Sequence, residues 1–98
     1  MWWTLWGQEA TPGRGISVGN GTGGVVDNNR VKNTNAALPG NGSTAIAVGT
    51  TNTLVDNNRL TNWDVGVNFT GSGKYHENLT SNVTTPFAGG GIAVAPNN

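Results

Sequence analysis

The sequence predicts an all-β protein, a right-handed parallel β-helix (solenoid) of about three coils and the start of a fourth. Two observations lead to this prediction: two short motifs alternate in a fixed order along the chain, and each motif alternates apolar with polar residues. Composition agrees with it, because 16 of the 98 residues are glycine. Such a chain suits short strands joined by many turns.

The longer motif occurs three times. It reads VDNNRVKN at residues 26–33, VDNNRLTN at residues 55–62 and, in a weaker copy, YHENLTSN at residues 75–82. Equivalent positions therefore return after 29 and then 20 residues. An extra loop near residues 35–43 explains the longer interval, because its Pro-Gly and Asn-Gly pairs are turn signals.

The shorter motif precedes each copy of the longer one and recurs once more near the end of the chain. Alternation of apolar and polar residues predicts half-buried strands. Equivalent residues recur in the same chain direction, so parallel strands should stack like on like at about 4.8 Å. The apolar pairs expected to point inward are Ile16 and Val18, Ile46 and Val48, Val67 and Phe69, and Ile92 and Val94.

Asparagine occupies the same positions in each copy of the longer motif. An inward asparagine at a bend can donate its amide to one neighbouring coil and accept from the other, which satisfies backbone groups left unpaired by the turn. Asparagine also tolerates the left-handed conformation that a sharp bend needs. The predicted ladders are Asn29, Asn58 and Asn78 in one column and Asn33, Asn62 and Asn82 in the other.

The two motifs together resemble the parallel β-helix repeats of the pectate-lyase-like superfamily, over residues 15 to 94. That superfamily includes polysaccharide lyases, glycoside hydrolases, phage tailspikes and adhesive surface proteins. The resemblance therefore implies an association with polysaccharide, but it does not choose between catalysis and binding.

Charge and cysteine content exclude several classes of protein. The formal net charge is zero and only 10% of the residues are charged, which argues against nucleic acid or an anionic membrane as a partner. Without cysteine, the chain can form neither disulfides nor thiolate metal sites. No apolar run approaches the roughly 20 residues of a membrane span, and the opening segment lacks the basic flank of a signal peptide.

Candidate ligand-binding residues lie around the repeated Asp-Asn-Asn-Arg bend. Asp27 and Asp56 should stack one coil apart, with Arg30 and Arg59 beside them, as a strip for a sugar chain or simply as an exposed face of the solenoid. Trp63 follows a repeat and either packs against the solenoid wall or binds sugar. The most economical interpretation assigns no catalytic residue, metal or other cofactor. Two stacked carboxylates could contact Ca²⁺, although they are too few to complete its oxygen shell.

The ends of the chain suggest how it assembles. Trp2, Trp3 and Trp6 lie outside the repeats, so residues 1–14 are expected to form a cap or interface segment and residues 15–98 the repeats. Because a short solenoid without caps exposes its core and its edges, we expect a homo-oligomer or a piece of a longer chain.

The sequence favours a non-catalytic structural or carbohydrate-associated module of an extracellular or virion-associated fibre protein. The alternative is a fragment of a polysaccharide lyase or glycoside hydrolase. A clustered set of acid and base residues on one outward strip would favour the enzyme, and the sequence offers little of it.

Overall fold

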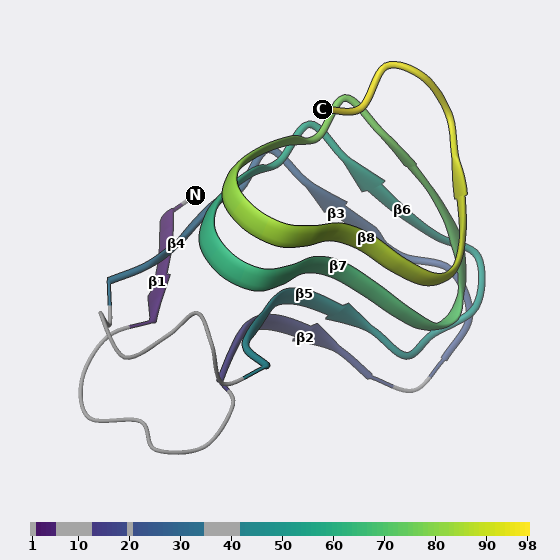
Figure 1. Ribbon diagram of the computed structural model, residues 1–98. Coiled ribbons are helices and arrows are strands. Elements are labelled where there is room, and N and C mark those ends of the chain that lie inside the picture. The colour runs from purple at the N-terminus through teal and green to yellow at the C-terminus, as the bar shows by residue number, and fades with distance from the viewer. Residues whose placement is uncertain (1, 6–12, 20, 35–41) are drawn as a thin grey trace.

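The computed structural model describes residues 2–5, 13–19, 21–34 and 42–98, and in these residues it is all-β (Figure 1). This confirms the predicted structural class. The strands are β1 (Trp2–Leu5), β2 (Arg14–Val18), β3 (Val25–Asp27), β4 (Arg30–Asn33), β5 (Thr44–Val48), β6 (Thr53–Asp56), β7 (Arg59–His76) and β8 (Leu79–Ala93).

Every strand pairing among the described residues is parallel. The sheet follows the order β1-β4-β7-β5-β2, while β3 pairs with β6, β6 with β7, and β7 with β8. Residues 29 apart stand side by side where β3 meets β6 and β4 meets β7, and residues 20 apart do so where β6 meets β7. Equivalent positions of the longer motif therefore lie next to one another in space.

The predicted stack of about three β-helix coils is wrong. Among the described residues, the strands belong to one sheet of eight strands, and Figure 1 shows that this sheet is curled. β7 runs for 18 residues and β8 for 15, and the two are paired with each other. Each strand continues through its bends, and the β7–β8 pairing resumes after a register shift between Phe69 and Gly73, so no separate turns divide this part of the chain into coils.

The predicted start of a fourth coil at residues 91–94 is also wrong. Gly91 and Ile92 pair with Gly73 and Lys74, whereas the β8 residue that pairs with Val67 is Phe87. Ile92 is 60% exposed and Val94 43% exposed, so neither residue points inward. A register shift between Phe69 and Gly73 contributes to this pairing, which spacing along the sequence does not reveal.

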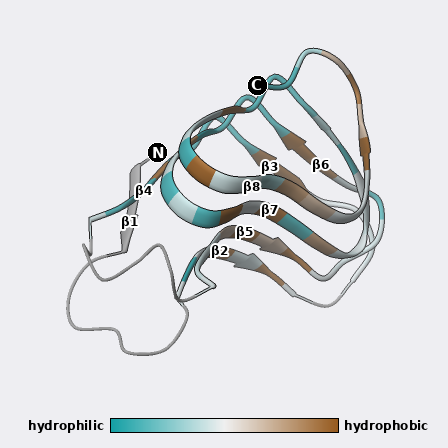
Figure 2. Cartoon of the chain, in the orientation of Figure 1, coloured by the Kyte–Doolittle hydropathy of each residue, from teal (hydrophilic) through white to brown (hydrophobic). Residues whose placement is uncertain are grey.

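The core lies inside the curl of the sheet. Alternate residues of several strands point into it, as the burial patterns of β3, β4 and β6 show, and Figure 2 shows hydrophobic segments on β3, β5, β6 and β7. Half-buried Tyr75 stacks between Phe69 and Phe87, with ring centroids 5.6 and 4.3 Å away. The buried hydrophobic side chains of the core are Val26, Val31, Ala45, Ile46, Val48, Val55, Leu60, Trp63, Val67 and Phe69.

Asparagine side chains connect neighbouring strands at one corner of the sheet. Asn58 Oδ1 accepts hydrogen bonds from the backbone N–H and Nδ2 of Asn29, both at 3.1 Å. Asn78 Oδ1 accepts the same two bonds from Asn58, at 3.1 and 2.9 Å. Asn97 Oδ1 continues the series by accepting from Asn78 at 3.2 and 3.1 Å. A buried chain of amides therefore satisfies the backbone where the sheet bends.

The second asparagine column is less buried. Asn62 Nδ2 donates to the Asn33 carbonyl at 2.9 Å, and Asn82 Nδ2 donates to Asn62 Oδ1 at 2.7 Å. Asn33 is buried, Asn62 is half-buried and Asn82 is exposed. Hydrogen bonding in this column therefore grows more accessible to water along the series.

The residues of the buried column, Asn29, Asn58 and Asn78, do not have positive φ angles; the residues directly before them do. Asn28, Asn57 and Glu77, each directly before a ladder asparagine, have φ of 54°, 54° and 55°. At each of the first two bends, two neighbouring asparagines therefore have different roles. The first adopts the left-handed conformation, and the second makes the side-chain hydrogen bonds to the neighbouring strands.

The N-terminal segment contributes a strand. Residues Trp2–Leu5 pair in parallel with Arg30–Asn33 and so cover an edge of β4. Trp6 and the insertion at residues 35–41 lie outside the described residues. The division into residues 1–14 and 15–98 stays a prediction.

Candidate functional site

Two rows of outward side chains flank the asparagine corner. Before the corner, Asp27 pairs with Asp56, and Asp56 pairs with His76. After the corner, Arg30 pairs with Arg59, and Arg59 with Leu79. The two rows place the candidate residues Asp27, Asp56, Arg30 and Arg59 on adjacent parts of one surface.

The acidic row ends in a contact between Asp56, His76 and Glu77. His76 Nδ1 lies 3.3 Å from Asp56 Oδ1, and His76 Nε2 lies 3.8 Å from Glu77 Oε1. The three side chains are between 38% and 53% exposed. A half-exposed imidazole therefore stands between two carboxylates and remains open to solvent on one side.

The basic row forms a groove with a neighbouring lysine. Arg30, Lys32 and Arg59 line it together with Val31 and Thr61, and its volume is about 410 Å³. Arg59 Nη1 donates to Asn57 Oδ1 at 3.0 Å, which holds one guanidinium beside the corner. Each of the three cationic residues is exposed.

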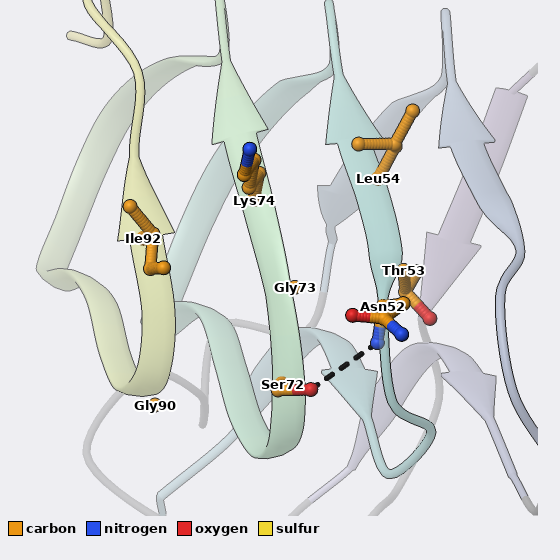
Figure 3. Close-up of a pocket in the computed structure, with 8 residues that line it drawn as sticks. All are labelled: Asn52, Thr53, Leu54, Ser72, Gly73, Lys74, Gly90 and Ile92. Atoms are coloured by element: carbon orange, nitrogen blue, oxygen red, sulfur yellow. Dashed lines mark hydrogen bonds between the residues drawn. The ribbon is translucent and has the colours of Figure 1, made fainter.

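A second groove, of about 280 Å³, crosses the outer face of β6, β7 and β8 (Figure 3). Leu54, Lys74 and Ile92 occupy paired positions on these three strands. The Asn52 backbone N–H donates to Ser72 Oγ at 3.2 Å across the groove, the contact that Figure 3 marks with a dashed line. Leu54 and Ile92 are 48% and 60% exposed, so this part of the surface is more apolar than the rows at the corner.

Trp63 is not part of either surface. It is fully buried in the core, and its indole Nε1–H donates to the Val31 carbonyl at 2.9 Å. A ring enclosed on all sides cannot stack on a sugar, so the structure places this residue in the packing role and not in the sugar-binding role.

Sequence reasoning missed several residues at these sites. Lys32 joins the two arginines because it points outward two residues after Arg30. Glu77 joins His76 where the first two copies of the motif have asparagine. Asn97 lies 19 residues after Asn78, close to the preceding interval of 20, and that spacing was a usable signal.

Comparison with known proteins does not assign the chain to a family. Searches against protein-family models, curated proteins and solved structures found no match. Within the described ranges, no helix is long and apolar enough to cross a membrane. Both the absence of a cofactor and the weaker alternative, in which Asp27 and Asp56 contact Ca²⁺, stay predictions.

Proposed function

We propose that this chain is a structural module without catalytic activity that binds an acidic polysaccharide in the groove of Arg30, Lys32 and Arg59. The observation that carries the proposal is the concentration of charge: the groove gathers three of the five Lys and Arg residues of a chain with no net charge.

Arg30 and Arg59 are directly paired on neighbouring strands. Like charges opposite each other destabilise a sheet, and an anion bound between them would relieve that repulsion. Guanidinium groups bind carboxylates and sulfates through two parallel hydrogen bonds. Such acid groups recur along a polysaccharide chain, so the groove offers both the charge and the donors that they need.

The acidic row, which contains Asp27 and Asp56, extends the surface beyond the groove. Asp27 and Asp56 are separated by one strand spacing, about 4.8 Å, close to the length of one sugar unit in an extended chain. Carboxylates accept hydrogen bonds from sugar hydroxyls and repel acid groups, so this row can contact only the uncharged hydroxyls of the polysaccharide. The ladder asparagines behind the rows hold the spacing fixed, and a rigid surface loses less entropy on binding.

Placement in an extracellular or virion-associated fibre is part of this proposal. It rests on the resemblance of the two motifs to those of polysaccharide-associated proteins. Homo-oligomerisation, or membership of a longer chain, belongs to the same proposal.

The direct test is binding of acidic and neutral oligosaccharides, measured by calorimetry at low salt. We expect Arg59→Gln to weaken binding of an acidic oligosaccharide at least fivefold, about 1 kcal/mol. Arg14→Gln is the matched control, because Arg14 is outside this groove, and it should change affinity less than about twofold. Equal affinity for neutral and acidic sugars, or equal effects of the two variants, would refute the proposal. So would equally tight binding of duplex DNA, because that would indicate a general polyanion site.

A fragment of a polysaccharide-degrading enzyme is the second candidate. The observation in its favour is the contact between Asp56 and His76, since a carboxylate beside an imidazole can orient it as a general base. Release of new sugar ends by the chain, abolished in Asp56→Asn, would replace the non-catalytic proposal by this one.

A further inference from the structure

The cluster of Asp56, His76 and Glu77 has a composition that sugar binding does not require. Each residue offers one ligand atom, and the three atoms lie within 4.8 Å of one another. His76 is the only histidine of the chain, and it stands where the two earlier copies of the motif have aspartate. The third copy therefore adds a nitrogen donor to a row of carboxylates.

Glu77 occupies an unfavourable backbone position. Its φ is 55°, and the equivalent residues of the other two copies are Asn28 and Asn57. Asparagine is several times more common than glutamate in this conformation. A glutamate here is costly to the fold, but its longer side chain reaches His76 Nε2 at 3.8 Å.

The distances between the ligand atoms of Asp56, His76 and Glu77 suit a small divalent ion after a small movement of one side chain. Zinc bound to nitrogen and carboxylate oxygen at about 2.1 Å needs neighbouring ligand atoms about 3.4 Å apart in a tetrahedron. Because one ion takes only one imidazole nitrogen, one of the two carboxylates must move. Glu77 is 53% exposed, so it can swing without disturbing the core.

We propose that Asp56, His76 and Glu77 bind a divalent first-row transition metal, with Zn²⁺ as the test ion. Three protein ligands leave a fourth position for water or for a ligand oxygen. Imidazole favours zinc, copper and nickel over calcium and magnesium, which prefer oxygen ligands alone. This inference does not depend on polysaccharide binding, because none of the three ligands lines the basic groove, although Asp56 also belongs to the acidic row beside it.

The test is a Zn²⁺ titration of the full chain, followed by calorimetry and by the NMR signals of its single imidazole. Zn²⁺ should shift the His76 signals, raise the midpoint of thermal unfolding, and keep its affinity in the presence of excess Ca²⁺. His76→Asn and Glu77→Gln should each weaken binding at least about tenfold.

Asp27→Asn is the matched control, since Asp27 lies in the same row but outside the cluster. It should change Zn²⁺ affinity less than about twofold. Equal affinity of wild type and His76→Asn would overturn the proposal, as would displacement of Zn²⁺ by equimolar Ca²⁺ or equal loss in all three variants.

Glu77→Asn provides an independent readout. It restores the residue type of the other two copies, so its thermal midpoint without metal should rise while Zn²⁺ binding is lost. A variant that still binds Zn²⁺ as tightly as wild type would show that Glu77 is not a ligand and would contradict the proposed site.

Discussion

Single asparagines decide how the backbone bends at the corner of this sheet. Asn58 Nδ2 donates to the Val26 carbonyl and to Asn78 Oδ1, while its own Oδ1 accepts two bonds from Asn29. Few side chains carry both a two-proton donor and an acceptor on so short a stem. The position is therefore specific for asparagine and not merely polar.

Replacing Asn58 by alanine should lower the free energy of unfolding by about 1–3 kcal/mol, because it leaves buried donors and a buried carbonyl without partners. Chemical denaturation measures this change. Asn68→Ala is the control: its paired neighbours are Ala47 and Ala88, so alanine suits the position and the change should stay within about 0.5 kcal/mol. Equal losses in the two variants would count against the hydrogen-bonded column.

For single residues, the sequence predicted which asparagines lie side by side on neighbouring strands, but it did not predict which of them adopts the left-handed conformation. Its repeats aligned Asn29, Asn58 and Asn78, the residues between which the hydrogen bonds run. It assigned the left-handed conformation to the asparagines of both columns. In the second column Asn62 and Asn82 adopt it, with φ of 68° and 55°. In the first column the preceding residues, Asn28, Asn57 and Glu77, adopt it instead. Adjacent asparagines have equal intrinsic tolerance for that conformation, so only the direction of each side chain relative to the core separates them.

Among the strands, length was the feature that sequence reasoning misjudged. β7 continues through Gly71 and Gly73, residues that read as turn signals. In the structure these glycines allow close approach instead, because a Cβ at Gly71 would overlap the Thr50 carbonyl of the neighbouring segment. A glycine required for strand contact and a glycine required for a turn look alike in one sequence.

Gly71→Ala should therefore destabilise the protein by about 2–3 kcal/mol, since the added methyl forces two backbone segments apart. Gly19→Ala is the matched change, with no heavy atom within 4 Å of its new Cβ and an expected effect within about 0.5 kcal/mol. Thermal unfolding compares the two. A Gly71→Ala protein as stable as Gly19→Ala would mean that these segments are not in contact.

In the molecule as a whole, the basic groove and the proposed metal-binding cluster both depend on the parallel pairing of other strands with β7. The basic groove exists because β4 lies beside β7, and the Asp56–His76 contact exists because β6 lies beside the end of β7. Neither pair is close in sequence. The repeats predicted these neighbours, but they could not predict a continuous curled sheet, because the persistence of pairing around a bend depends on packing inside it.

Deleting residues 1–14 should expose the edge of β4, because Trp2–Leu5 pairs with it. We expect the free energy of unfolding to fall by about 2 kcal/mol through the lost backbone hydrogen bonds. Calorimetry and light scattering report stability and assembly together. A truncated chain with an unchanged melting temperature and an unchanged size would mean that the segment is dispensable.

Parallel register is the claim on which both proposed sites depend, and solution NMR of the uniformly labelled chain tests it most directly. The account predicts cross-strand contacts between residues 29 apart from β4 to β7 and 20 apart from β6 to β7. It also predicts slow exchange of the Asn58 and Asn78 side-chain amides, which are buried and hydrogen-bonded. Antiparallel contacts, or side-chain amides that exchange as fast as those of exposed Asn82, would contradict the account.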